Sequence, residues 1–304
     1  MSEQRRLARQ VISRSIYFLI LAGVIVFLVQ QGAEPWKLAA RHWKALIAVM
    51  IVSAAGYLVQ AATFRECLPL AETRPNLKTL LHIWATSGIT SLLAPLMAGL
   101  AVRLVLLNHA GVGPVTSGLA SLRQIWFNLE CAFVLAGAVL LIFPFPLPDM
   151  SGWLLATTGV CAWGLRRFVA FRHRRGALER IARVTVLAQP LRMVALPWLW
   201  GQLLAMSCNY WVAFNFTGAI ISFPEALLIA ALTVALSVAF FVPNGLGLLD
   251  GLWVWLGQYH GLASPHAVAL ALILRVGNVA AAIVLWVIVS LVTFDPTTRK
   301  KQSP

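Results

Sequence analysis

The residues best suited to chemistry in this chain lie in a glycine-rich stretch, Phe-Phe-Val-Pro-Asn-Gly-Leu-Gly-Leu-Leu-Asp-Gly, at residues 240–251. Pro243 breaks a helix, and Asp250 supplies a carboxylate that would bind a cation or a proton, or else cap the following helix. Three residues with a permissive backbone would leave amides open to a phosphate: Asn244, Gly245 and Gly247. The stretch lies within an apolar run, and broken hydrophobic segments of this kind form substrate sites in membrane carriers.

An earlier segment has a related layout. Pro95 and Gly99 are spaced as Pro243 and Gly247 are, and Arg103 follows four residues after Gly99. A guanidinium forms paired hydrogen bonds with phosphate oxygens, so Arg103 is a candidate ligand for a headgroup phosphate. The alternative is an arginine that extends to the membrane interface. The two segments together indicate a membrane carrier.

Other polar residues also interrupt apolar segments. Arg275 lies nine residues after His266, about 13 Å along a helix, which favours either a functional site or an ion pair with a residue such as Asp250 or Glu130. Extension to the interface is the alternative. Glu130 is itself a candidate relay group, with an interfacial position as the alternative. Interhelical hydrogen bonds are expected from three further residues: His82, Asn209 and Tyr210.

The composition indicates an integral membrane protein. Apolar residues make up 60% of the chain and charged residues 11%, whereas a soluble domain has roughly 25% charged residues. The net charge is +14, and eight of the 24 basic residues are arginines within residues 166–192. This clustering between apolar spans is typical of a cytoplasmic loop near anionic lipid, and it argues against a nucleic-acid partner.

No motif for catalysis or for a metal is apparent in the sequence. The four cysteines are far apart, and their spacing fits no metal site. Phosphate-binding P-loops, hydrolase nucleophile motifs and zinc-protease motifs are absent from the sequence. We therefore expect neither an enzyme nor a cofactor.

Charge and parity predict an all-α polytopic membrane domain over residues 1–304, with about eight membrane segments. Six would be full spans and two re-entrant hairpins of opposite orientation, as in an inverted repeat. The first half would be 45–143 with a hairpin at 79–107, and the second 195–293 with a hairpin at 225–262. Both termini and the basic loop 166–192 would be cytoplasmic, and Arg123 and Gln124 would face the rim before a span at 125–143.

A second topology remains open, with plain spans at 79–107 and 225–262. The first topology places residues 37–44 outside although they carry three basic residues, which counts against it.

Residues 243–251 resemble the Pro-Gly-Gly-x-Gly-x-x-Glu-Gly element of the flippase-like membrane family that includes the transmembrane region of lysylphosphatidylglycerol synthases. Residues 261–275 resemble the segment that follows it, and residues 95–103 resemble the first-half Pro-x-x-x-Gly-Glu-x-x-Arg element. Order and spacing match over about residues 45–295. There are two departures: Leu100 stands where the family has an acid, and Arg123-Gln124 replaces a Glu-Arg pair.

The resemblance implies a stand-alone translocator of a phospholipid or lipid-linked headgroup in the inner membrane, with Arg103, Asp250 and Arg275 near the path. Its partners would be membrane lipids with anionic or phosphate-bearing headgroups. Since the chain stops at Pro304, we expect no synthase domain and no synthesis of aminoacyl lipids. Two other functions remain open: an ion-coupled carrier of a small solute, and a non-transporting scaffold that docks a lipid-biosynthesis enzyme through loop 166–192.

Overall fold

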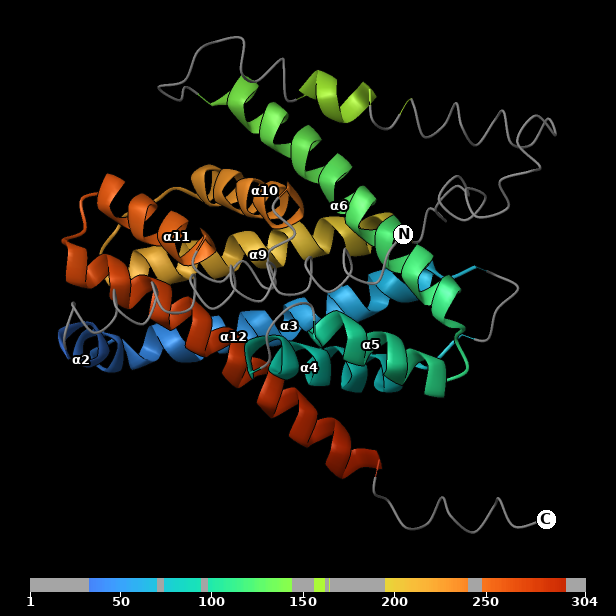
Figure 1. Cartoon of the computed structure of the whole chain (residues 1–304). Coiled ribbons are helices and arrows are strands. Elements are labelled where there is room, and N and C mark those ends of the chain that lie inside the picture. Colours follow the sequence, from blue (N-terminus) through green and yellow to red (C-terminus); the bar gives the residue numbers. More distant parts are fainter. Residues whose placement is uncertain are drawn as a thin grey trace, which may run out of the picture.

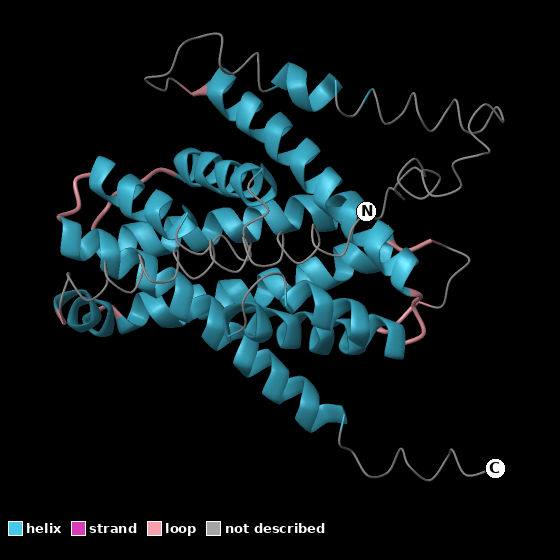
Figure 2. Ribbon diagram, viewed as in Figure 1, coloured by secondary structure: helices cyan, strands magenta, loops and turns pink. Residues whose placement is uncertain are grey.

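The structure is a computed structural model that describes residues 33–69, 74–93, 98–143, 156–161, 164, 195–239 and 248–293. Within these ranges the chain forms helices and short connections, without a β-strand (Figure 2). The predicted all-α class is therefore confirmed for this part of the chain. Several predictions fall on residues outside these ranges: Pro95, Pro243, Asn244, Gly245, Gly247, the first span, loop 166–192 and both termini.

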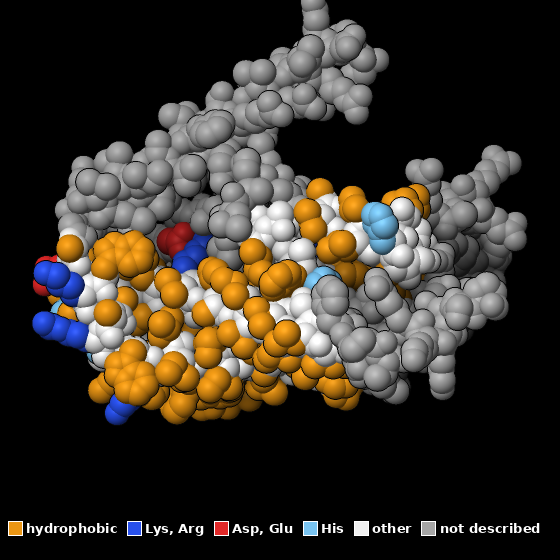
Figure 3. All heavy atoms as spheres, turned by 90° about the horizontal axis from the view of Figure 1, so that it is seen from below, with side chains coloured by type: hydrophobic (Ala, Val, Ile, Leu, Met, Phe, Trp, Pro, Cys, Tyr) orange, Lys and Arg blue, Asp and Glu red, His pale blue; other side chains and the backbone are white. Residues whose placement is uncertain are grey.

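Three helices are long and apolar enough to cross a membrane: α3 (Trp43–Cys67), α6 (Pro114–Ile142) and α12 (Ser264–Thr293). Even the shortest, with 25 residues, reaches about 38 Å at 1.5 Å per residue, more than the ~30 Å hydrocarbon core of a bilayer. The surface between the ends of the molecule is largely hydrophobic, and Lys and Arg gather at the end where α2 (Glu34–Arg41) lies (Figure 3). These features support a membrane-embedded protein.

Helix α3 lies at the centre of the bundle and packs against α9 (Ala195–Thr217) and α12 (Figure 1). Close approach depends on small residues, as is common between helices in membranes. Gly56 faces Ala205 of α9, and a side chain at Gly277 of α12 would overlap Val49. This packing brings polar residues of α3, α9 and α12 to one level of the bundle.

Two pairs of shorter helices flank this centre. The first pair is α4 (Leu77–Leu93) and α5 (Ala98–His109), and the second is α10 (Phe223–Ala239) and α11 (Leu248–Tyr259). Each pair has 17 and then 12 residues, so its helices are about 26 and 18 Å long, shorter than the hydrocarbon core. Their bounds lie close to the predicted hairpins 79–107 and 225–262; re-entry into the membrane stays a prediction.

The turn after each pair is built in the same way. Gly111 and Gly261, 150 residues apart, both adopt φ 85°, a left-handed conformation that favours glycine. The same two backbone hydrogen bonds close each turn: Gly111 N to Asn108 O and Val112 N to Leu107 O, then Gly261 N to Gln258 O and Leu262 N to Gly257 O. The two turns lie at opposite ends of the molecule (Figure 1). An inverted repeat would place the two turns at opposite ends, but their placement alone does not establish such a repeat.

One predicted boundary was wrong. The span expected at 125–143 begins eleven residues earlier, because Gly113 and Pro114 start α6 there. Arg123 and Gln124 therefore lie inside a helix and are buried, instead of preceding it as expected. Arg123 donates to the Cys67 carbonyl oxygen, and Gln124 donates to the Gln60 carbonyl oxygen.

Candidate functional site

Arg103 extends from α5 toward α4. Its Nε and Nη2 atoms donate to the Ser87 hydroxyl oxygen at 3.3 and 3.2 Å, and its guanidinium lies 4.3 Å from the centroid of the Trp84 ring. Both contacts orient the charge without neutralising it, since a hydroxyl and an indole carry no formal charge. No carboxylate within ion-pair distance of Arg103 is found among the described residues.

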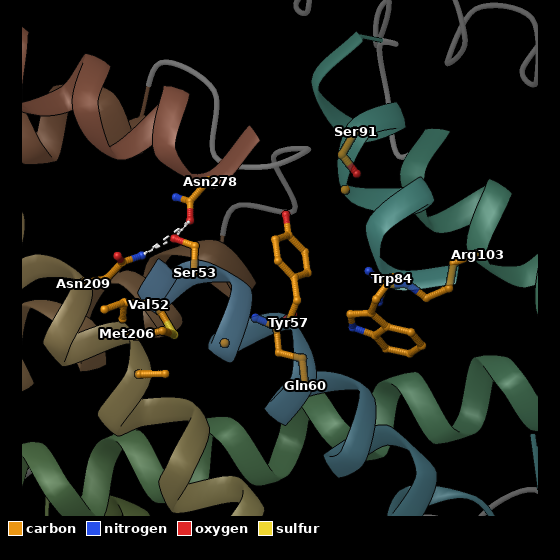
Figure 4. Close-up of a pocket in the computed structure, with 13 residues that line it drawn as sticks. Val52, Ser53, Tyr57, Gln60, Trp84, Ser91, Arg103, Met206, Asn209 and Asn278 are labelled. Atoms are coloured by element: carbon orange, nitrogen blue, oxygen red, sulfur yellow. Dashed lines mark hydrogen bonds between the residues drawn. The ribbon is translucent and has the colours of Figure 1, made fainter. Parts of the chain in front are cut away.

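The Arg103 guanidinium borders a cavity of about 200 Å³ between α3, α4, α5, α9 and α12 (Figure 4). Its lining includes the following polar residues: Ser53, Tyr57, Gln60, Ser91, Arg103, Asn209 and Asn278. Arg103 is the one charged residue among the lining residues that the structure describes. A positive charge surrounded by neutral hydrogen-bonding groups suits an anion, and a phosphate above all.

Two glycines shape the cavity. Gly99 is buried against α4, where a side chain would overlap the Ser91 hydroxyl, so α5 approaches closely enough for Arg103 to reach Ser87. A Cβ on Gly88 would lie 2.7 Å from the Tyr57 hydroxyl oxygen, so this glycine makes room for the Tyr57 ring. Gly99, which the sequence pattern singled out, is thus needed for close packing of α5 against α4. Pro95, which was predicted together with it, lies outside the described residues.

A cluster of polar side chains from three helices forms the other end of the cavity. The Ser53 hydroxyl donates to Asn278 Oδ1 at 2.7 Å, and Asn209 Nδ2 donates to the Ser53 hydroxyl oxygen at 2.8 Å (Figure 4). The interhelical hydrogen bond expected of Asn209 is confirmed. Asn209 Oδ1 is buried without a hydrogen-bond partner among the described residues. A buried acceptor left unpaired is costly to the folded state.

Asp250 and Arg275 form an ion pair away from this cavity. Arg275 Nε donates to Asp250 Oδ1 at 2.6 Å, and Nη2 donates to Oδ2 at 2.9 Å. The Arg275 guanidinium lies 5.4 Å from the centroid of the Trp253 ring. Neither charged residue lines the Arg103 cavity. Of the alternatives that the sequence left open for Arg275, the structure has the ion pair with Asp250 and not the one with Glu130.

Two interpretations of single carboxylates were wrong. Asp250 does not cap a helix that begins at Gly251, because α11 begins at Leu248 and the carboxylate binds Arg275. Glu130 is not interfacial, because it is buried within α6 and accepts a hydrogen bond from Trp126 Nε1. A relay role for Glu130 stays a prediction. Among the described residues, no three His, Cys, Asp or Glu side chains gather as a metal site would require.

Sequence reasoning missed most of the cavity lining. Ser53, Tyr57 and Gln60 are spaced four and three residues apart on α3, which places them on one helix face. Ser87 and Ser91 repeat this spacing on α4. Polar residues at helical spacing within apolar helices were the available signal.

Comparisons with protein-family models, with curated proteins and with solved structures found no match. The resemblance described above therefore remains a prediction from the residues that carry it.

Proposed function

We propose that this protein is a translocator that carries the phosphate-bearing headgroup of a lipid across the membrane, through the cavity around Arg103. The observation that carries this proposal is the charge of Arg103, which lies inside an apolar bundle without a carboxylate partner in the part of the chain that the structure describes. Placing an arginine there without a carboxylate is costly, and an anionic substrate would supply the missing counter-charge.

The headgroup phosphate would bind the Arg103 guanidinium, and the acyl chains would stay in the surrounding lipid. A neutral donor on α3, the Tyr57 hydroxyl, would replace part of the water around the phosphate. The helix pairs α4–α5 and α10–α11 would be re-entrant hairpins of an inverted repeat, which would open the cavity to each side in turn.

Transport in this proposal is passive or coupled to an ion. Asp250 is the candidate coupling group, because its protonation would remove one charge from the pair that joins α11 to α12. If transport and its pH dependence survived the Asp250→Asn change, coupling through this carboxylate would be excluded.

The charge pattern of the sequence supports a place in the inner membrane with both termini in the cytoplasm. We further propose that the protein transports and does not catalyse a reaction.

The test is leaflet-resolved scrambling of headgroup-labelled phosphatidylglycerol in proteoliposomes. Wild type should scramble the lipid, Arg103→Ala should not, and Arg103→Lys should keep part of the rate, because lysine retains the charge without the paired geometry. Arg65→Ala is a matched control, since Arg65 is exposed at the end of α3 and does not line the cavity. Equal rates in wild type and Arg103→Ala would refute the proposal.

A second candidate is a carrier of a small soluble anion. The cavity volume of about 200 Å³ favours it, because typical ligand pockets range over about 300–1,000 Å³. Uptake of labelled glycerol 3-phosphate into proteoliposomes, without scrambling of any lipid, would support this candidate over the first.

A further inference from the structure

We infer that the cavity selects a phosphate ester whose remaining headgroup is hydroxylated and uncharged, and discriminates against headgroups with an ammonium group. The inference rests on the proposed function and names its substrate class. It follows from the two ends of the cavity, which differ in chemistry.

The first end carries the charge. Arg103 has five N–H donors, and Ser87 is its one hydrogen-bond acceptor among the described residues. The Trp84 ring holds the guanidinium plane, so the remaining donors have a fixed direction. A phosphate with two free oxygens matches this arrangement.

The second end is polar and neutral. Ser53 of α3, Asn209 of α9 and Asn278 of α12 are joined by hydrogen bonds, and Asn209 is about nine-tenths buried. All three side chains line the cavity and are neutral hydrogen-bonding groups, which suits a hydroxyl group of the ligand. A glycerol or sugar hydroxyl next to the phosphate would therefore bind at this end while the phosphate binds Arg103.

An ammonium group would find no counter-charge. The cavity lining that the structure describes contains no carboxylate, and Asp250 lies away from it, paired with Arg275. A buried ammonium without a partner loses its hydration, and Arg103 would repel it. Both effects would weaken the binding of amine headgroups.

The experiment is calorimetric titration of the full chain in detergent with two soluble headgroup analogues, glycerophosphoglycerol and glycerophosphoethanolamine. Wild type should bind glycerophosphoglycerol about tenfold more tightly than glycerophosphoethanolamine. The first compound gains a hydrogen-bonded hydroxyl, whereas the second leaves its ammonium group without a counter-charge. Asn209→Asp places a carboxylate at the neutral end and should remove or reverse that preference.

Asn128→Asp is the matched control. Asn128 also has a buried, unpartnered Oδ1 atom but does not line the cavity, so the preference should not change. The preference is a ratio within one preparation, so a smaller folded fraction in a variant does not alter it.

Equal affinities, a preference for the amine, no binding of either compound, or the same response in both variants would overturn the inference. The proposed function fails separately, if wild type does not scramble phosphatidylglycerol. Wild type could show the preference and take up glycerol 3-phosphate without scrambling any lipid. That result would assign the same substrate class to a carrier of a soluble anion. Scrambling without the preference would leave the proposed function intact and refute the substrate class.

Discussion

Two arginines in this protein have similar neighbours and opposite electrostatic situations. Arg103 in α5 lies against Trp84, and Arg275 in α12 lies against Trp253. Arg275 also forms two hydrogen bonds with Asp250, whereas the described neighbours of Arg103 include no carboxylate. Arg275 thus joins two helices through an ion pair, and we propose that Arg103 serves a ligand instead.

The two halves of the chain also differ at a position close to Arg103. The turns at Gly111 and Gly261 repeat the same hydrogen bonds 150 residues apart. With the same shift, Asp250 corresponds to Leu100, which carries no charge. The same shift pairs Arg103 with Trp253 and Arg275 with Ile125, so the two arginines are not equivalent positions; Leu100, three residues before Arg103 on α5, offers it no acid.

The largest effect is expected when the same substitution is made at both arginines. Arg103→Gln should reduce binding of glycerophosphoglycerol about 100-fold, because it removes the charge that faces the phosphate. Arg275→Gln should leave the affinity of the folded protein nearly unchanged. Calorimetric titration of both variants checks this, and equal losses in the two would contradict the separation of roles.

The ion pair should matter for stability. Asp250→Asn should lower the free energy of unfolding by about 1–3 kcal/mol, because it leaves the Arg275 charge without its carboxylate. The effect should stay moderate, since the two side chains are 17% and 23% exposed. Unfolding by denaturant in detergent measures it. The double variant Asp250→Leu/Arg275→Met should recover part of the loss, and an additive further loss would refute a direct pairing.

A carboxylate added to the first half should make it resemble the second. Leu100→Glu places an acid three residues before Arg103 on α5, a spacing that allows an ion pair, and should weaken anion binding about tenfold. Val105→Glu is the control, because Val105 is exposed on α5 two residues from Arg103 and so faces away from it. Equal affinities in Leu100→Glu and wild type would contradict the role assigned to the missing acid.

The smallest effect is expected from the shape of the cavity. Gly88→Ala should displace the Tyr57 hydroxyl and weaken binding by about threefold to tenfold, since one contact is misplaced while the charge remains. Gly118→Ala in α6 meets no atom within 4 Å and should leave binding unchanged. Titration of the two alanine variants side by side tests whether the hydroxyl contributes.

The sequence predicted the parts of this arrangement that depend on composition and local spacing. The apolar helices, the limits of the two short helix pairs and the pairing of Asp250 with Arg275 follow from hydropathy, proline and glycine positions, and the scarcity of charge. The cavity could not be predicted in the same way. Ser53, Asn209 and Asn278 come from three helices, and only the packing of α3 against α9 and α12 brings them together.

The errors have a similar cause. Arg123 and Gln124 look like a polar rim because charge usually marks the end of a span. Both are buried and donate to carbonyl oxygens of α3, at Cys67 and Gln60, and such tertiary partners are not visible in one sequence.

The central claim is that the Arg103 cavity binds the headgroup phosphate, and an experimental structure of the protein in phosphatidylglycerol nanodiscs tests it most directly. The account predicts phosphate density within about 3 Å of the Arg103 guanidinium, with the headgroup hydroxyls toward Asn209 and Asn278. A phosphate bound instead beside Asp250 and Arg275, with no headgroup at Arg103, would contradict it.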